Sequence, residues 1–223
     1  MSIVLSARDI RKTYKTSSGD VPVLNGVSCD FEQGLFYALI GRSGSGKSTL
    51  LHILGGLDRP DSGQVLVNGK DICAMNDEQM AVFRRRHMGF VFQQFNLLEE
   101  YNVRRNICMP MQLDGRRPDP RFYEEVVGTL GLSEKVRKYP AELSGGEQQR
   151  VAIARSILAK PELIIADEPT GNLDKKTGDD VLELLTSCAA RFGQTLIVVT
   201  HDPEIAKKAD QVFRIEDGRL SGN

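Results

Sequence analysis

The sequence has few cysteines, no long apolar run and no excess of charge of either sign. Its four cysteines, Cys29, Cys73, Cys108 and Cys188, are scattered without a CxxC pair, which favours unpaired core thiols in a reducing cytosol over disulfides. Lysine and arginine number 29 against 30 aspartates and glutamates, a formal charge of -1, so no overall basic field indicates a nucleic-acid partner. No apolar run approaches the roughly 18 residues needed to span a bilayer. The opening MSIVLSARDIRKTYK carries charges where a signal peptide needs an apolar centre. These absences predict a cytoplasmic protein.

The composition and the order of apolar runs indicate an α/β fold. With 40% apolar and 26% charged residues among 223, the chain can bury a substantial core as one large domain or two closely packed lobes. Four short runs are apolar without alternation, as in parallel strands covered on both faces, at 36–40, 89–92, 163–167 and 195–200. Segments of helical character lie between them, at 47–54, 77–87, 119–131, 145–159, 175–191 and 203–208. Such alternation of strand and helix predicts a mostly parallel sheet.

Two regions depart from this alternation. Residues 3–10, 21–31 and 64–72 have half-buried strand patterns, and Asn68-Gly69 is a strong two-residue hairpin signal. We therefore expect a small N-terminal antiparallel sheet beside the parallel core. Residues from about 95 to 158 hold helices without a clear strand, which predicts an inserted helical lobe. The prediction is one domain, 1–223, with the core and β-subdomain formed by about 1–94 and 159–223.

A glycine-rich loop lies directly between the strand at 36–40 and the helix at 47–54. Its residues fit the phosphate-loop pattern: Gly41, Arg42, Ser43, Gly44, Ser45, Gly46, Lys47 and Ser48. Glycines let successive backbone N–H groups turn around an anion, and the following helix points its positive end at the same place. Lys47 can reach the β- and γ-phosphates, while Ser48 can offer its hydroxyl to Mg²⁺. We expect the phosphates of a nucleotide to order this loop.

Two carboxylates follow the apolar run at 163–167. In LIIADEP, Asp167 and Glu168 end a buried strand, where two acids need compensation that a metal supplies. Asp167 is expected to hold Mg²⁺ directly or through water. Glu168 points to the other side and can polarise a water for in-line attack on the γ-phosphate. A solvated Asp-Glu pair at a strand end is the alternative interpretation.

The stretch LSGGEQQRVAIARSILAKP (143–161) carries a second glycine motif. Ser144 and Glu147 form S-x-x-E, a capping box that opens an amphipathic helix. The cap leaves Gly145 and Gly146 unexplained, and paired glycines at a helix N-terminus make another anion-binding surface. Because Lys47 already faces the one γ-phosphate of a nucleotide, this second surface is expected to address a nucleotide held by another copy of the chain.

Taken together, these motifs resemble the ATP-binding-cassette (ABC) family over essentially the whole length. Walker A (Gly41–Thr49), the signature LSGGE (143–147) and Walker B LIIADE (163–168) occur in that family's order. Weaker members of the set match as well: Tyr14 the aromatic that stacks on adenine, Gln93 the Q-loop glutamine, Asp174 the D-loop aspartate and His201 the switch histidine. Gln94 is a rival for the role of Gln93. Two departures stand out, Glu147 where many members have glutamine, and a D-loop that begins Gly-Asn in place of Ser-Ala.

The resemblance implies an ATP- and Mg²⁺-dependent head-to-tail homodimer, with each ATP between one Walker A and the signature of the partner copy. It assigns Glu168 as general base, His201 as a γ-phosphate contact, Asp174 as a link between the two sites, and Gln93 as the link from metal or attacking water to the helical lobe. A transporter role then requires separate integral membrane permease subunits, docking near residues 95–111. The protein would lie on the inner face of the cell membrane through them. Arg84–Arg86 could meet lipid headgroups, or form a solvated helix end.

GFVFQQFNLL and ADEPTGNLD resemble one bacterial branch of the family, which includes the ATPases of lipoprotein release, macrolide efflux, antimicrobial-peptide resistance and the cell-division complex. Its shared theme is ATP-driven closure that bends membrane subunits, so the cargo is expected to be a lipoprotein, peptide, drug or similar amphipathic molecule. Alternatives are a nutrient-importer ATPase, a regulatory ATPase of a cell-division-type complex, a soluble ABC ATPase of translation or DNA repair, and a small-molecule kinase. The kinase leaves LSGGE unexplained. Copurification of a membrane protein, rather than ribosomes or DNA, discriminates among the others.

Overall fold

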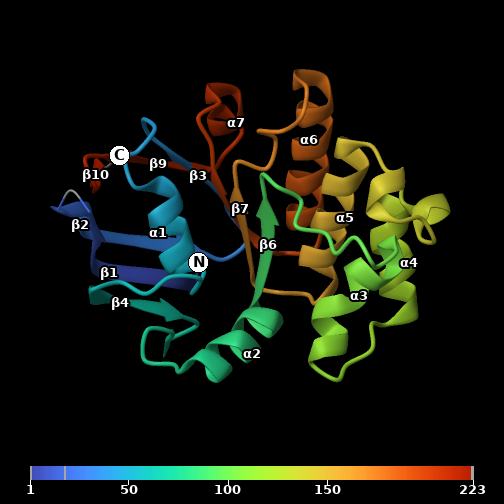
Figure 1. Ribbon diagram of the computed structural model, residues 1–223, viewed down its shortest axis with the longest axis horizontal. Helices are drawn as coiled ribbons and strands as arrows, with labels where there is room; N and C mark the ends of the chain where they lie inside the picture. Colours follow the sequence, from blue (N-terminus) through green and yellow to red (C-terminus); the bar gives the residue numbers. More distant parts are fainter. Residues whose placement is uncertain (1, 18, 222–223) are drawn as a thin grey trace.

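The computed structural model describes residues 2–17 and 19–221 and contains two sheets with helices around them (Figure 1). The larger sheet has six strands in the order β10-β9-β3-β8-β7-β6. Five of them are parallel: β3 (Phe36–Ile40), β6 (Met88–Phe92), β7 (Leu163–Asp167), β8 (Thr195–Val199) and β9 (Gln211–Glu216). The edge strand β10 (Arg219–Ser221) runs antiparallel to β9. The four predicted parallel strands are thus present, whereas the sequence did not predict the β9-β10 hairpin.

Both faces of the parallel sheet are buried, which explains why its strands lack alternation. In β7, Leu163 and Ile165 belong to the apolar cluster shared with α1 and the antiparallel sheet. The intervening Ile164 and Ala166 belong to a second cluster shared with the other helices. Because successive side chains of a strand point to opposite faces, one strand serves both cores. The sheet is therefore a rigid central layer whose strand ends can hold functional side chains.

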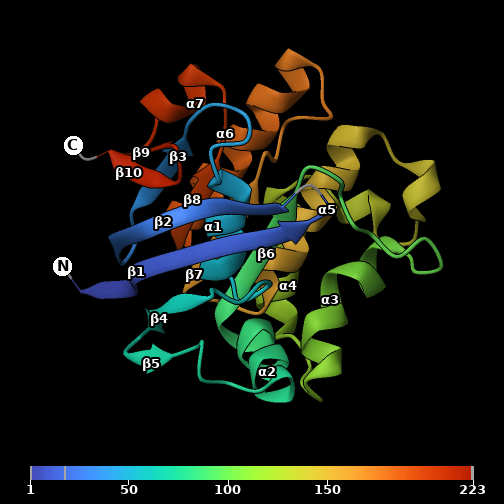
Figure 2. The ribbon, with the colours of Figure 1, turned by 60° about the vertical axis from the view of Figure 1, so that its left-hand side comes forward.

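The smaller sheet is antiparallel and has the order β2-β1-β4-β5. Its strands are β1 (Ile3–Thr16), β2 (Gly19–Glu32), β4 (Ser62–Val67) and β5 (Lys70–Asp71). Asn68 and Gly69 join the last two, with φ of 49° and 75°, the pair of positive angles that a type I′ turn requires. Figure 2 shows the long β1-β2 ribbon passing across α1, so the predicted N-terminal antiparallel sheet is confirmed.

The helices are α1 (Lys47–Leu54), α2 (Asp77–His87), α3 (Val103–Leu113), α4 (Pro120–Thr129), α5 (Gly145–Leu158), α6 (Lys175–Arg191) and α7 (Pro203–Lys207), with 3₁₀ turns at Ser133–Lys135 and Pro140–Glu142. Six of the seven match segments predicted as helical. The exception is α3, which contains Pro110, a residue that normally ends a helix. Figure 1 shows α3 to α6 gathered on one side of the parallel sheet, with α1 and the antiparallel sheet on the other.

Helix α5 lies directly against the parallel sheet. A Cβ built on Gly89 of β6 would be 2.5 Å from the carbonyl oxygen of Ser156, so glycine is needed for this close approach. All four cysteines are free thiols, with Cys73 half-buried and the other three buried. Among the described residues, none of the helices combines the length and apolarity needed to cross a membrane. The carboxyl ends of β3, β6, β7 and β8 lie at one edge of the sheet, where ligands of parallel α/β sheets bind.

Candidate active site

The glycine-rich loop joins the end of β3 to the start of α1, as predicted. Gly41, Gly44 and Gly46 have φ of 158°, 77° and 101°, and the last two lie in the left-handed region that favours glycine. A Cβ on Gly46 would also be 2.8 Å from the carbonyl oxygen of Val23. The ammonium of Lys47 donates to the carbonyls of Gly41 and Arg42 at 3.0 and 2.9 Å. The loop is therefore wound around its own lysine, which is 7% exposed.

A cavity of about 550 Å³ opens over this loop. Its lining combines residues of the loop and of the start of α1 with one residue of β2 and two residues that follow β7 and β8. They are Val23, Ser43, Gly44, Gly46, Lys47, Ser48, Thr49, Glu168 and His201. Backbone N–H groups of a loop, the N-terminus of α1 and an ammonium all favour an anion at this place. The cavity thus brings together the predicted phosphate loop, the predicted general base and the predicted switch histidine.

An oxygen-rich pair lies at the α1 side of the site. The Ser48 hydroxyl donates to Oδ1 of Asp167 at 3.1 Å, and Nε2 of His52 is 3.5 Å from Oδ2 of the same carboxylate. The hydrogen bond to Asp167 raises the pKa of His52 above its ordinary value, against the opposing effect of burial. A hydroxyl and a carboxylate within hydrogen-bond distance are hard oxygen donors of the kind that Mg²⁺ prefers. These two residues fit the predicted metal.

Glu168 occupies a strained backbone position immediately after β7. Its φ is 44°, in the left-handed region that costs a non-glycine residue about 1–3 kcal/mol. Its N–H donates to the carbonyl of Val199 at 3.0 Å, and its Oε1 lies 3.3 Å from Nδ1 of His201. The turn aims the carboxylate into the cavity and beside the histidine, whereas Asp167 faces Ser48. The two adjacent acids therefore serve different neighbours, as the sequence predicted.

Gln93 follows the end of β6 and does not line this cavity. Its Nε2 donates to Oδ1 of Asn172 at 3.0 Å, and Nδ2 of Asn172 donates back to the carbonyl of Gln93 at 3.0 Å. Gln149, fully buried in α5, donates from Nε2 to the carbonyls of Phe92 and Pro169. Sequence reasoning assigned no role to Asn172 or Gln149. The only available signal was the Gly-Asn at the start of the D-loop.

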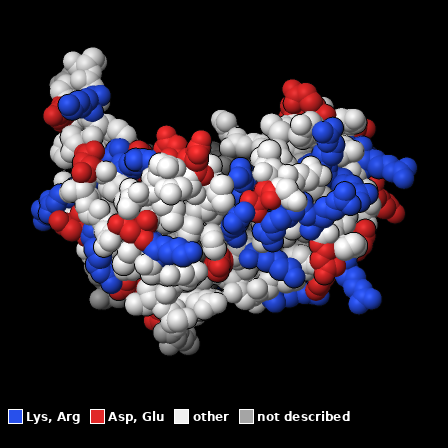
Figure 3. Space-filling model, turned by 90° about the horizontal axis from the view of Figure 1, so that it is seen from below, with Lys and Arg blue, Asp and Glu red and all other residues white. Residues whose placement is uncertain are grey.

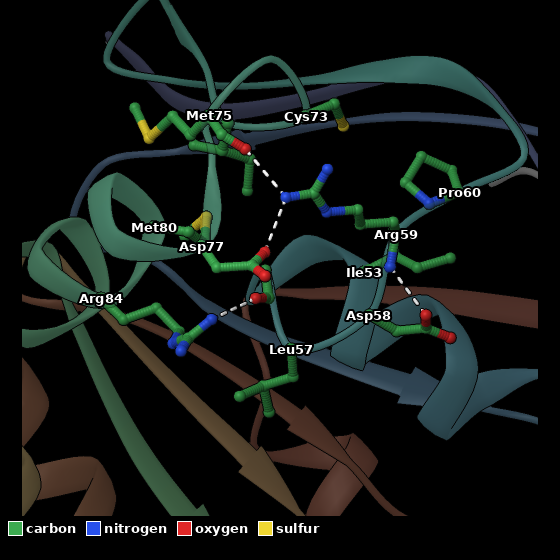
Figure 4. Close-up of a pocket in the computed structure, with 12 residues that line it drawn as sticks. Ile53, Leu57, Asp58, Arg59, Pro60, Cys73, Met75, Asp77, Met80 and Arg84 are labelled. Carbon is green, nitrogen blue, oxygen red and sulfur yellow. Dashed lines mark hydrogen bonds and ion pairs between the residues drawn. The ribbon is translucent and has the colours of Figure 1, made fainter.

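Tyr14 lies in β1 and is 39% exposed as a residue, while its hydroxyl is hydrogen-bonded. The hydroxyl donates to Oδ2 of Asp58 at 2.7 Å and is also hydrogen-bonded to the side chain of Thr49. Lys12 donates to Oδ1 of Asp58 at 2.9 Å, and its Nζ lies 5.1 Å from the centre of the Tyr14 ring. Figure 4 shows Asp58 on the loop after α1, where it also accepts from the N–H of Arg59. An exposed aromatic ring is thus tethered to both ends of α1.

The signature residues lie at the N-terminus of α5 and do not line the cavity of their own chain. Ser144 and Glu147 form the predicted capping box, with Glu147 N–H donating to Ser144 Oγ and Ser144 N–H donating to the Glu147 carboxylate at 2.8 Å. A bond from Lys135, followed by the one from Ser144, holds the pKa of Glu147 below its usual value. A Cβ on Gly146 would lie 2.5 Å from Cγ2 of Thr177, so this glycine has a packing role that the sequence did not reveal.

Asp174 caps α6 and lies near Glu168 and His201. Its carboxylate accepts from the N–H of Thr177 at 3.1 Å. Its pKa is lowered by the hydrogen bonds from the side chain and the backbone of Thr177. Asp174, Leu173, Glu168 and His201 all line a second cavity of about 280 Å³. The predicted D-loop residue therefore lines the same cavity as Glu168 and His201, and it also caps α6.

Comparison with known protein families decides the identity of this arrangement. Residues 24–171, which include the phosphate loop, Gln93, the signature and both acids, match the model of the ABC transporter family. The chain is a member of the ABC transporter family. The resemblance found in the sequence, the fold class and the ATPase activity expected from it are thereby confirmed.

Relatives within the ABC transporter family place the chain more closely. It is 45% identical over 222 residues to the lipoprotein-releasing system ATP-binding protein LolD of Geobacter metallireducens, covering 99% of both chains. It is 46% identical over 219 residues to the macrolide export ATP-binding/permease protein MacB of Syntrophobacter fumaroxidans, covering 96% of this chain but 31% of that protein. The chain thus spans the full length of LolD and about a third of MacB. This bears out the predicted lipoprotein-release and macrolide-efflux branch.

A solved structure shares the fold. The ATP-binding cassette MJ0796, described as dimeric in a post-hydrolysis state with ADP and phosphate, superposes with a TM-score of 0.87 at 35% identity. The match covers 97% of this chain and 96% of that one. The individual roles of the site residues and the division into core and helical lobe stay predictions.

Proposed function

We propose that two copies of this ABC ATPase close head-to-tail over two ATP molecules and thereby drive integral membrane permease subunits. The observation that carries the proposal is the separation of the machinery within one chain. The cavity over the phosphate loop is lined by Lys47, Glu168 and His201, but not by Ser144, Gly145 or Gly146. A second copy would supply the signature. The dimeric state of the MJ0796 cassette supports this arrangement.

The phosphate loop and the two strand-end acids divide the work on ATP. The backbone N–H groups of 41–46 and Lys47 hold the phosphates. Ser48 and Asp167 would hold Mg²⁺, which would supply positive charge beside the phosphates. Glu168 accepts the proton of the attacking water. His201, 3.3 Å from Glu168, contacts the γ-phosphate and fixes the carboxylate next to it. Tyr14 offers its exposed ring to the adenine.

Closure brings opposite charges together. Each γ-phosphate is negative, and the partner's signature offers the Ser144 hydroxyl, the N–H of Gly146 and the positive end of α5. ATP therefore holds the two copies together, and loss of the γ-phosphate weakens the contact. In this scheme Asp174 and Gln93 transmit the state of one site to the partner copy and to the helical lobe of residues 95–158.

The permease subunits are proposed to dock at a groove between α2, β6 and α3. Apolar side chains line this groove of about 400 Å³, among them Leu57, Met88, Phe90, Met109, Pro110 and Leu113. Arg84, Arg85 and Arg155 add positive charge to it, and Figure 3 shows lysine and arginine gathered over the α2 and α3 side of this face. An amphipathic segment with a carboxylate fits such a groove. Within the docking region 95–111, part is ordinary core, because Val103, Ile107 and Cys108 are buried.

The relatives indicate the class of cargo. The names of LolD and MacB refer to lipoprotein release and macrolide export, and both cargoes are amphipathic. We propose cargo of this class, and a position on the inner face of the cell membrane through the permease subunits. No nucleic acid is required by this scheme.

The test is the Glu168→Gln variant. It should bind ATP, hydrolyse it at least about 100-fold more slowly, as expected for loss of a general base, and elute as a dimer on gel filtration with Mg²⁺ and ATP. Glu183→Gln, exposed on α6, is the matched control and should leave turnover unchanged. Near-normal turnover in Glu168→Gln, or a monomer in the presence of ATP, would contradict the proposal.

A further inference from the structure

The Gly-Asn that begins the D-loop is the one motif that the proposed function leaves without a role. In the structure Asn172 is hydrogen-bonded to Gln93, which precedes it by 79 positions in the sequence. A Cβ built on Gly171 would meet the same Gln93 side chain. The amide of Asn172 both accepts from Nε2 of Gln93 and donates to its backbone carbonyl, each at 3.0 Å. We propose that Gly171 and Asn172 hold the Gln93 side chain in a fixed position, which we call its seat. Asn172 is then a positioning residue that controls when this side chain is available to the metal site.

Gly171 is needed for the seat because of its neighbour and not because of its own backbone. Its φ is outside the positive region, so an alanine could adopt the same conformation. A Cβ at this position would nevertheless lie 2.8, 3.0 and 3.2 Å from Nε2, Cδ and Cγ of Gln93. Distances below 3.0 Å between a Cβ and another heavy atom force a displacement. A serine here, as in the commoner family pattern, would push Gln93 off Asn172.

The two segments that form the seat are fixed relative to each other. Buried Gln149 donates to the carbonyl of Phe92, the residue before Gln93, and to the carbonyl of Pro169, two residues before Gly171. A hydrogen bond from the N–H of Gly171 to the carbonyl of Glu168 at 3.0 Å closes the turn after β7. Gln93 and Asn172 are therefore brought into register by their main chains before the side chains pair.

The seat holds Gln93 outside the cavity over the phosphate loop, whose lining does not include it. Reaching Ser48 and Asp167 requires the Gln93 side chain to exchange its bond to Asn172 for one to the metal or water. A net hydrogen bond of this kind corresponds to a factor of about 3 to 10 in an equilibrium constant. Asn172 belongs to the D-loop and lies four positions after Glu168. Movement of the D-loop would therefore break or remake the bond between Asn172 and Gln93. This inference rests on the proposed role of Gln93 at the metal.

The decisive measurement is the Mg²⁺ preference of nucleotide binding. In the Glu168→Gln background, the dissociation constant of a fluorescent N-methylanthraniloyl-ATP is measured with Mg²⁺ and with EDTA. Asn172→Ala should raise the ratio of the constant with EDTA to the constant with Mg²⁺ about threefold to tenfold. The reason is that metal binding no longer requires breaking the bond between Gln93 and Asn172. Gly171→Ala should change it in the same direction. Gly128→Ala, where a Cβ meets nothing within 4 Å, should not change it.

A double-mutant cycle with Gln93→Ala separates positioning from a general structural effect. The effect of Asn172→Ala should disappear in the Gln93→Ala background. An unchanged ratio in Asn172→Ala, or an equal effect with and without Gln93, would overturn the inference.

Failure of the proposed function would give a different experimental result. If Gln93→Ala alone leaves the Mg²⁺ preference unchanged, Gln93 does not serve the metal. Whether Asn172 and Gly171 hold Gln93 is then tested separately, by the side-chain NH₂ resonances of the ¹⁵N-labelled protein. Both Asn172→Ala and Gly171→Ala should shift the Gln93 signals, and Gly128→Ala should not. Unshifted signals would overturn the seat itself.

Discussion

The packing of Gly146 against Thr177 allows the structural and functional reasons for a signature glycine to be measured separately. An alanine at Gly146 would place its Cβ 2.5 Å from Cγ2 of Thr177. The threonine cannot turn away easily, because it is stiff at χ1 and its side chain is hydrogen-bonded to Asp174. Overpacking of this kind costs about 1–3 kcal/mol. Alanine regains at most about 0.5–1 kcal/mol through its helix propensity.

Gly146→Ala should therefore lower the free energy of unfolding by about 1 kcal/mol, the difference between the midpoints of these two ranges. For a domain of this size that corresponds to a fall of about 2–4 °C in Tm. Urea and thermal unfolding, followed by circular dichroism without nucleotide, measure it. Thr177→Ser removes the methyl group and keeps the hydroxyl, so Gly146→Ala/Thr177→Ser should regain the lost stability.

The same double variant isolates the functional part. If the N–H and open surface of Gly146 meet the partner's nucleotide, the ATP-driven dimer should stay weakened after stability is restored. Wild-type stability of Gly146→Ala, or failure of Thr177→Ser to rescue it, would refute the packing argument. Full recovery of the dimer would show instead that the glycine matters for packing alone.

Two further predictions concern residues around the site. Asp58→Ala should weaken nucleotide binding about threefold to tenfold, since one hydrogen bond then no longer orients the Tyr14 ring. Tyr14→Phe removes the same bond and should weaken binding similarly. Equal affinity of Tyr14→Phe and wild type in a fluorescent-ATP titration would contradict this. Glu147→Gln keeps the helix cap but loses the ion pair with Lys135, which contributes about 0.2–1 kcal/mol. Because the folded pKa of Glu147 is lowered, this contribution is present above the ordinary glutamate pKa of about 4.3 and lost as the pH falls through the lower folded value. The difference in urea stability should thus shrink between pH 7 and about pH 3, and a constant difference would count against the ion pair.

The elements predicted well are those whose signal is local. Helix α1 begins and ends at the predicted residues because the glycine loop and Lys47 fix its start and Gly55 follows its end. The buried strands were found because both of their faces are apolar. The β9-β10 hairpin was missed although Asp217 and Gly218 carry the turn signal, with φ of 48° and 72°. Its strands are partly exposed and lack a continuous apolar run.

The site was predictable as a set of motifs but not as a set of contacts. Spacing placed Ser48, Asp167 and Glu168 at strand and helix ends that meet at one edge of the sheet. The bond between Gln93 and Asn172, and that between Tyr14 and Asp58, join residues 79 and 44 positions apart. Such pairs depend on loop conformations and rotamers that are determined by packing, which local sequence patterns do not describe.

The two carbonyls that accept from Lys47 give the lysine a second role as an internal hydrogen-bond donor. When its ammonium turns toward a triphosphate, the oxygens of Gly41 and Arg42 must find water or another donor. Nucleotide binding at this loop therefore exchanges one set of hydrogen-bond partners of Lys47 for another. It is not simply the attraction of an anion to an unpaired positive charge. A variant without the lysine would lose a brace of the loop together with a phosphate contact, so its weakened binding would overstate the electrostatic attraction.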